Sequence, residues 1–364
     1  MKSPFTFCLS CCVLFWGVAF SARSAPVAPV APVKTSDPTQ QCLAFSPYVD
    51  KLNPNFGPSP SRELIDTLLD KIVAETPFRC IMTYGVVNGL EYTFAAAEAR
   101  NIKVVAIIWL DNDVAVNSQS IRSGIEVARA FPETIVKLSC GSEVRTRNGY
   151  AFDGEISRCI TALREAKVKQ PITTIDTWWE WCDRKRPCKP TSFAQQVDWI
   201  GINVFPWWEN RHADLFKCTP ADQAAAFHLA RYNDVQKTYP GKPVAITEFG
   251  WPHGPRGMTV KNQHTGKNCG LASPKDQALV VQSTLKLMQQ KKHAVTVFEA
   301  FDEAWKASKE ADVGAFWGVC SGEAPYSCAK FLAHLSSAIV YSSHLDKNFD
   351  LTGREIIEGN NSEN

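Results

Sequence analysis

One pattern recurs along the sequence: a short apolar run, a turn cluster, and a stretch with the spacing of an amphipathic helix. Strands are expected at 42–46, 79–84, 103–109, 134–140, 172–176, 199–205, 244–248 and 294–301. Eight strands that alternate with helices predict a (β/α)8 TIM barrel, and the alternative is a doubly wound open sheet. The sequence contains no GxGxxG or GKS/T phosphate loop, which weakens the nucleotide-binding version of that alternative.

The two ends of the chain differ in composition from this repeating part. Residues 1–25 have a Lys near the start, an apolar stretch and then small residues, which predicts a secretory signal peptide, with a retained signal anchor as the alternative. Residues 26–40 form a Pro-Ala-Val-rich linker. The barrel domain is expected at 41–345, followed by a polar tail at 346–364 in which Asn360 begins a glycosylation sequon.

Composition and charge exclude several kinds of partner. The chain has 364 residues, of which 45% are hydrophobic, and this predicts a globular protein with a large core. The formal net charge of +2 and the lack of long basic runs argue against nucleic acid. No segment after residue 25 is long and apolar enough to span a bilayer, so we expect an exported protein with no membrane partner after signal removal.

Ten of the 13 cysteines lie outside the expected signal peptide, an even number that suits an oxidising compartment. The expected disulfides are Cys182–Cys188, Cys320–Cys328 and Cys218–Cys269. The remaining four lie in apolar segments and are interpreted as free buried thiols: Cys42, Cys80, Cys140 and Cys159. Because none of these ten cysteines forms a CxxC pair, no zinc or other metal site is expected.

Two acids stand at the ends of predicted strands. Glu143 follows the fourth strand in KLSCGSEV, and Glu248 ends the seventh strand in ITEFGWP. In a (β/α)8 barrel the chemistry lies at the carboxyl ends of the strands, where strands four and seven face each other. Either acid alone would fit a helix cap or a salt bridge. Together they favour the nucleophile and the acid/base of a glycosidase, which retains the anomeric configuration when the carboxyls are about 5 to 5.5 Å apart.

Aromatic residues gather at the predicted strand ends, where their rings would suit the apolar faces of sugars. They are Trp109, Trp178, Trp179, Trp181, Phe205, Trp207, Trp208, Trp251, Trp305 and Trp317. Core packing is the alternative and is the better interpretation for Trp109 and Trp199. It is less natural for WWEW and PWWE, because consecutive tryptophans cannot all face one core.

Several of these segments resemble glycoside hydrolase family 17, the β-1,3-glucanase family. ITEFGWP resembles the nucleophile motif, CGSEVRTR the acid/base motif, and FEAFDEAWK the eighth-strand segment of that family. LAFSPYVD, IKVVAIIWL and INVFPWWE resemble its first, third and sixth strand segments. The segments follow the family order from Cys42 to Trp317.

The resemblance implies a secreted enzyme, extracellular or in a cell wall, that acts on β-1,3-glucan by hydrolysis or glycosyl transfer without a cofactor. Glu143 would be the proton donor and then the base, and Glu248 the nucleophile. The expected substrate-binding residues are Tyr84, Ser142, Phe205, Trp207, Trp251, Glu299, Glu303, Trp305 and Lys306. Salt bridging and loop packing are the alternative roles for the charged and aromatic residues of this set. A hydrolase for another β-glycan and a non-catalytic glucan-binding wall protein are the alternative functions.

Three residues depart from the family pattern. Ser142 stands where relatives have Asn, Met82 where they often have Arg, and Phe205 where a Tyr is expected. The retained pair of glutamates argues against an inactive enzyme. Since the acid must be protonated and the nucleophile ionised, the two carboxyls need unequal surroundings. The cations Arg145, Arg147 and Lys306 are candidates for creating that inequality, whereas His253 and His264 are interpreted as loop residues.

Overall fold

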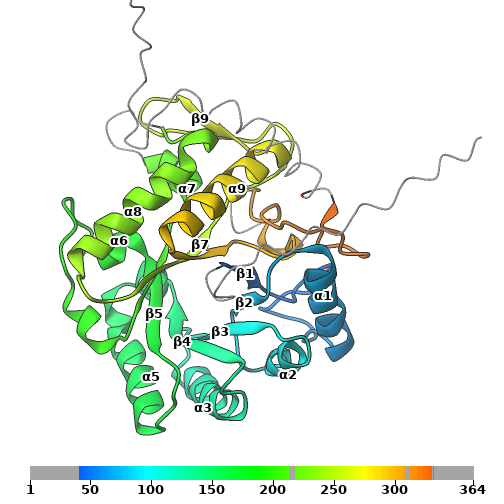
Figure 1. The fold of residues 1–364 in the computed structure, drawn as a ribbon, viewed down its shortest axis with the longest axis vertical. Helices are drawn as coiled ribbons and strands as arrows, with labels where there is room; N and C mark the ends of the chain where they lie inside the picture. Colours follow the sequence, from blue (N-terminus) through cyan, green and yellow to red (C-terminus); the bar gives the residue numbers. More distant parts are fainter. Residues whose placement is uncertain (1–40, 213–217, 308–311, 330, 332–364) are drawn as a thin grey trace, which may run out of the picture.

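The computed structural model describes residues 41–212, 218–307, 312–329 and 331, and within them eight parallel strands close into a barrel (Figure 1). Around the barrel the strand order is β1-β10-β7-β6-β5-β4-β3-β2. The strands are β1 (Gln41–Phe45), β2 (Cys80–Thr83), β3 (Lys103–Ile108), β4 (Ile135–Ser142), β5 (Ile172–Thr177), β6 (Ile200–Asn203), β7 (Val244–Phe249) and β10 (Ala294–Val297). All eight predicted strands and the TIM barrel are confirmed, and the open sheet is excluded.

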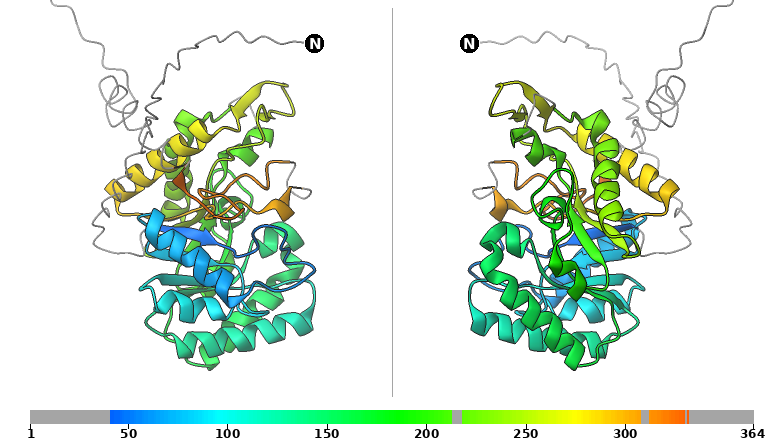
Figure 2. Two further views of the ribbon diagram at one scale, coloured as in Figure 1. Left: turned by 90° about the vertical axis from the view of Figure 1, so that its right-hand side faces the viewer. Right: turned by 90° about the vertical axis from the view of Figure 1, so that its left-hand side faces the viewer.

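Helices cover the outside of the barrel (Figures 1 and 2). They include α1 (Arg62–Glu75), α2 (Tyr92–Glu98), α3 (Val114–Ala130), α5 (Asp153–Glu165), α8 (Ala224–Thr238) and α9 (Pro274–Lys291). Ser61, Asp113 and Ser273 cap three of them, each side chain accepting a hydrogen bond from a backbone N–H of the first turn. Three short helices follow strands at their carboxyl ends: α4 (Val144–Asn148), α6 (Trp178–Trp181) and α7 (Pro206–His212).

The barrel interior and the helix layer form separate cores. Strand residues alternate between them, so Leu43 and Phe45 pack against the helices while Cys42 and Ala44 point into the barrel. Trp199 is 2% exposed and lies in the interior, as expected. Interior packing also explains Met82, which is fully buried there.

The hydrogen-bond register of the barrel is irregular only at two of its eight described strands, β4 and β7. Every pairing of these two strands contains a register shift, whereas β1–β2, β2–β3, β5–β6 and β1–β10 are regular. On the β5 side, the shift in β4 falls between Ser139 and Ser142. Bulges of this kind bend a strand and re-aim its side chains. The two strands that carry Glu143 and Glu248 are therefore the distorted ones.

Five disulfides join the described cysteines. Cys182–Cys188, Cys218–Cys269 and Cys320–Cys328 confirm the predicted pairs. The interpretation of the other four as free thiols is wrong: Cys42 pairs with Cys80, and Cys140 pairs with Cys159. β1 and β2 are neighbours, with Leu43 opposite Ile81, and this brings the Cα atoms of the preceding cysteines to 4.5 Å. The apolar segments bury the disulfides rather than thiols.

The long segment after β7 contains a hairpin of β8 (Thr259–Lys261) and β9 (Asn268–Leu271), which the sequence did not predict. The hairpin stands away from the barrel strands near α7 and α9 (Figure 1). Cys269 in β9 is joined to Cys218, so the expected pinning of this loop is confirmed.

The predicted signal peptide (1–25), the linker (26–40), the tail (346–364) and Asn360 lie outside the described residues, as does most of 330–345. Within the described residues, no helix has the length and apolar character needed to cross a membrane.

Candidate active site

Glu143 lies directly after β4 in a left-handed backbone conformation, with φ 53° and ψ 33°. Few residues other than Gly adopt this conformation unless their surroundings impose it. Here the Glu143 N–H donates to the Ile175 carbonyl at 2.8 Å. Asp176 then accepts from the Arg145 N–H at 2.9 Å and from the Thr146 hydroxyl at 2.6 Å. These bonds to β5 fix the abrupt turn at which β4 ends.

The Glu143 carboxyl is held by a residue of β6, which is two strands away from β4 in the barrel. Asn203, the last residue of β6, donates through Nδ2 to Glu143 Oε1 at 2.9 Å, and Thr247 Oγ1 donates to Asn203 Oδ1 at 2.8 Å. Burial raises the pKa of Glu143, while the Asn203 donor and the positive charge of Arg147 oppose that rise. The Arg147 guanidinium lies over the Trp109 ring, 4.4 Å from its centroid. Trp109 is partly exposed, so its interpretation as a core residue is wrong.

Glu248 lies within β7 and is 6% exposed. The Tyr84 hydroxyl donates to Glu248 Oε1 at 2.8 Å. Tyr84 follows β2, which is separated from β7 by β1 and β10, so the hydrogen bond crosses part of the barrel mouth. Burial and the nearby Glu248 raise the pKa of Tyr84, so its hydroxyl keeps the proton that it donates.

A buried cluster of opposite charges follows β10. Lys306 Nζ lies 2.6 Å from Glu299 Oε2 and also forms an ion pair with Glu303. Glu303 accepts further hydrogen bonds from the Ser46 hydroxyl and from Trp305 Nε1. Burial raises the pKa of Glu299 well above its usual value, with Glu303 adding to the rise and Lys306 opposing it. Salt bridging, the alternative considered for this group, is thus present.

The aromatic residues expected in the cleft have different exposures. Phe205 and Trp305 are partly exposed, whereas Trp207 and Trp251 are 1% and 0% exposed. The last two pack edge to face at 5.2 Å, and Trp251 Nε1 donates to the Leu271 carbonyl at 2.9 Å. Stacking of these two rings on a sugar is therefore a wrong expectation, because the hairpin segment covers them. That they shape the cleft stays a prediction.

Two of the three departures from the family pattern, Ser142 and Phe205, have different surroundings. Ser142 is 3% exposed at the end of β4, and its carbonyl accepts from Arg147. The Phe205 ring packs edge to face against Phe298 and Trp317, at centroid distances of 5.5 and 5.3 Å. Arg145, one of the expected cations, is engaged by Asp153 through two hydrogen bonds of 2.7 Å, which leaves Arg147 as the cation that acts on Glu143.

Sequence reasoning missed Asn203 and Asp176. Burial raises the pKa of Asp176 to about 7, and the negative charge of Glu143 adds to the rise. Asp176 ends the strand expected at 172–176, as Glu248 ends the seventh, whereas Asn203 lies inside the run expected at 199–205. Their contacts with Glu143 and with the turn after it depend on the register of the barrel strands, which local sequence does not give.

One residue, Asn203, neighbours both glutamates. Asn203 is the Cα partner of Glu248 across β6 and β7, and the same residue donates its side-chain hydrogen bond to Glu143. The structure thus brings both carboxyls, together with Tyr84, to the carboxyl-terminal mouth of the barrel. Among the described residues, no group of three or more His, Cys, Asp or Glu side chains is arranged to hold a metal ion.

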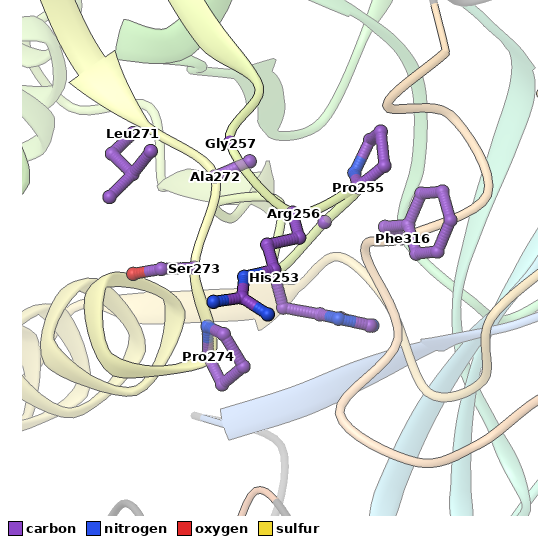
Figure 3. Close-up of a pocket in the computed structure, with 10 residues that line it drawn as sticks. His253, Pro255, Arg256, Gly257, Leu271, Ala272, Ser273, Pro274 and Phe316 are labelled. Carbon is purple, nitrogen blue, oxygen red and sulfur yellow. The ribbon is translucent and has the colours of Figure 1, made fainter.

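A separate hollow of about 600 Å³ lies between the segment after β7 and the start of α9. Figure 3 shows Phe316 and Pro255 on one side of it and Leu271 and Ser273 on the other. Neither glutamate lines it. His253 beside it bonds both carboxylate oxygens of Asp302 at 3.0 Å and so joins two loops, in keeping with its interpretation as a loop residue.

An eight-stranded parallel barrel with a carboxyl pair at its mouth is the architecture of many glycoside hydrolases. Residues 42–318 match the BtgE/BtgC glycoside hydrolase domain, and the chain belongs to that family. It is 23% identical over 292 residues to a probable β-glucosidase, btgE, of Aspergillus terreus, with 78% of this chain and 46% of the relative covered. It is 26% identical over 259 residues to a probable family 17 glucosidase, SCW4, of Saccharomyces cerevisiae, with 68% and 58% covered. The chain thus spans about half the length of these relatives.

Solved structures share the fold. An active-site mutant of a Rhizomucor miehei β-1,3-glucanosyltransferase in complex with laminaritriose superposes with a TM-score of 0.61 at 20% identity, covering 79% of this chain and 95% of that one. An endo-laminarinase from Formosa superposes with a TM-score of 0.63 at 17% identity, covering 78% and 84%. At these identities the likeness concerns the fold alone.

Proposed function

We propose that this protein is a retaining glycoside hydrolase of family 17 that acts on β-1,3-glucan, with Glu248 as nucleophile and Glu143 as acid/base. The observation that carries the proposal is the convergence at Asn203, which is opposite Glu248 in the sheet and hydrogen-bonded to Glu143. Two carboxyls at one mouth, each with different partners, are what a double displacement requires.

In the first step, the Glu248 carboxylate attacks the anomeric carbon and forms the glycosyl–enzyme ester. The bond to the leaving oxygen breaks as protonated Glu143 gives that oxygen its proton. The raised pKa of Glu143 supports its role as the acid, because it keeps the proton available at a higher pH than an exposed Glu would. Tyr84 holds one oxygen of Glu248 through its hydrogen bond and so orients the attack.

In the second step, ionised Glu143 removes a proton from an incoming hydroxyl, which attacks the same carbon and releases Glu248. Water as the acceptor gives hydrolysis, and a sugar hydroxyl gives glycosyl transfer. Retention follows from the two inversions. The segment after β7, with its hairpin and the Cys218–Cys269 disulfide, would shape the acceptor side of the cleft.

The proposed substrate rests on the relatives and on the cleft. Their names include a family 17 glucosidase and a β-1,3-glucanosyltransferase bound to laminaritriose. The partly exposed rings of Tyr84, Phe205 and Trp305 would contact the glucan, and Ser142, Glu299, Glu303 and Lys306 would support or line the site. Trp207 and Trp251 would act only from beneath the surface.

We also propose secretion, with the signal peptide, linker, barrel domain and tail bounded as the sequence predicts. Five disulfides support passage through an oxidising compartment, because cytosolic thiols are normally kept reduced. An extracellular or cell-wall location agrees with a glucan substrate.

Product analysis on linear β-1,3-glucan tests the proposal. The purified protein should release shorter oligosaccharides, and longer products at high donor concentration would identify transfer. Glu248→Gln should abolish both, whereas Glu180→Gln, a matched change at a carboxyl paired with Arg184, should not. If the protein binds laminarin and releases nothing, it is a glucan-binding protein instead. If it cleaves only β-1,4-linked glycans, the substrate proposal is wrong.

A further inference from the structure

We propose that Asn203, held by Thr247, positions the acid/base by fixing which oxygen of Glu143 carries the transferable proton. The inference rests on the proposed function and adds a positioning residue to it. Asn203 is 2% exposed and Thr247 is 3% exposed, so water does not compete for their hydrogen bonds.

The orientation of the Asn203 amide follows from its two partners. Thr247 Oγ1 donates to Asn203 Oδ1 at 2.8 Å, and a hydroxyl that donates must face the carbonyl end of the amide. Because the amide is planar, its Nδ2 then faces Glu143 Oε1, at 2.9 Å. In the orientation that accepts from Thr247, the amide offers a donor to the acid/base.

The bulge in β7 makes this arrangement possible. Consecutive residues of a regular strand point to opposite faces. The Thr247 hydroxyl nevertheless reaches Asn203 while the neighbouring Glu248 carboxyl reaches Tyr84. The register between β6 and β7 passes from Ile202–Ile246 to Asn203–Glu248, so Thr247 is the extra residue of the bulge. One distortion therefore positions the nucleophile and, through Thr247 and Asn203, the acid/base.

The consequence concerns a single proton. A protonated carboxyl has one carbonyl oxygen, which accepts, and one hydroxyl, which donates. Because the Asn203 N–H points at Oε1, a proton on Oε1 would meet another donor, whereas a proton on Oε2 leaves Oε1 free to accept. Oε2 would then give its proton to the leaving oxygen in the first step. The same Oε2 would take the proton of the incoming hydroxyl in the second.

Leaving-group dependence separates this role from a merely structural one. Laminarihexaose needs its leaving oxygen protonated, whereas 2,4-dinitrophenyl β-laminaribioside releases a stable phenolate without a proton. Asn203→Ala should lower kcat/KM about 10- to 100-fold on laminarihexaose and less than about 3-fold on the dinitrophenyl glycoside. Thr247→Val should act in the same direction with a smaller effect, because Asn203 remains but loses its orientation.

The matched control is Asn210→Ala. Asn210 is also 2% exposed, but within the part of the chain that the structure describes its side chain bonds to the backbone of Thr219 and Cys269 alone. This change should affect both substrates equally or neither. Thermal unfolding of each variant shows whether it is folded at the assay temperature.

The pH profile gives a second readout. Glu143 faces Asn203 on β6, Asp176 on β5 and Arg147 on α4, and Asn203 and Arg147 both lower its pKa. The protonated form of Glu143 sets the alkaline limb of kcat/KM. Loss of the Asn203 donor should therefore move that limb to higher pH, with the acid limb unchanged.

An equal loss on both substrates, or no loss on either, in folded Asn203→Ala would overturn the inference. Failure of the proposed function has a different signature. In that case wild type would cleave neither substrate, or Glu143→Gln would lack the leaving-group dependence that defines an acid/base.

Discussion

The two glutamates at the barrel mouth have contrasting surroundings. Glu143 stands after its strand in a left-handed turn and receives an amide hydrogen bond, with Arg147 and Asp176 nearby. Glu248 lies within its strand and receives a hydroxyl hydrogen bond from Tyr84. Different partners and surroundings are how a fold separates two chemically identical carboxyls into an acid and a nucleophile.

The contrast extends to the backbone. β4 is distorted before Glu143 and β7 is distorted at Thr247 and Glu248, while the pairings among β1, β2 and β3 are regular. A bulge interrupts ladder hydrogen bonds, so a barrel would not gain stability from one. The irregular register at these two strands therefore serves the placement of side chains at the mouth.

The largest effect should come from removing either carboxyl, and the products should tell the two apart. Glu248→Ala should lose at least about 10³-fold in kcat/KM, and Glu143→Ala roughly 10²- to 10⁴-fold on unactivated glucan. With azide and an activated β-laminaribioside, Glu248→Ala should yield the α-azide by one inversion. Glu143→Ala should yield the β-azide through the covalent intermediate. Exchange of these outcomes, measured by NMR of the products, would reverse the assignment.

The next largest effect on activity is expected from replacing Tyr84, which donates a hydrogen bond to Glu248. Tyr84→Phe removes a hydrogen bond to a charged group, worth about 1.5 to 3 kcal/mol, so kcat/KM should fall roughly 10- to 100-fold. Because Tyr84 bonds the proposed nucleophile, activated and unactivated substrates should lose equally in kcat/KM, unlike with the Asn203 variant. Tyr92→Phe is the control, since its hydroxyl donates to Asp66 in the helix layer. Steady-state kinetics on both substrates checks the prediction.

A smaller effect on activity is expected for Asp176→Asn, on the Glu143 side. The pKa of Asp176 is raised from 3.8 to about 7 by burial, so the folded state favours its neutral form. Its contribution to stability is full below about pH 4 and is lost as the pH rises through about 7. Wild type should therefore lose stability over this window relative to Asp176→Asn. Denaturant unfolding at pH 4, 5.5 and 7 measures the difference, and a constant difference would contradict the raised pKa.

The smallest effect on activity should follow loss of the two buried disulfides. One joins β4, the strand before Glu143, to α5, and the other joins β1 to β2, the strand before Tyr84. Replacing both cysteines of Cys140–Cys159 or of Cys42–Cys80 by Ser should cost about 2 to 4 kcal/mol of unfolding free energy. The loops span 19 and 38 residues, so the second pair should cost about 0.6 kcal/mol more. Activity at low temperature should change less than about 3-fold. An unchanged melting temperature would argue against the pairing.

Much of the fold could be predicted from local patterns, because the hydrophobic periodicity of a segment indicates whether it is a strand or a helix. Glu143 and Glu248 were visible since each ends an apolar run. The partners of these residues were not visible, because Asn203 reaches Glu143 across β5 only when the barrel closes. The pairing of Cys42 with Cys80 and the burial of Trp251 depend in the same way on neighbours distant in sequence. Local sequence gives no measure of those contacts.

Trapping of the glycosyl–enzyme tests the central assignment most directly. The attacking carboxylate should displace fluoride ion from the anomeric carbon of a 2-deoxy-2-fluoro-β-laminaribiosyl fluoride. The product is a stable ester between the sugar and the enzyme, and peptide mapping by mass spectrometry locates the labelled residue. The account predicts one equivalent of label on Glu248, with normal labelling in Glu180→Gln and none in Glu248→Gln. Label on Glu143 or on another carboxyl, or full inactivation with Glu248 unmodified, would contradict it.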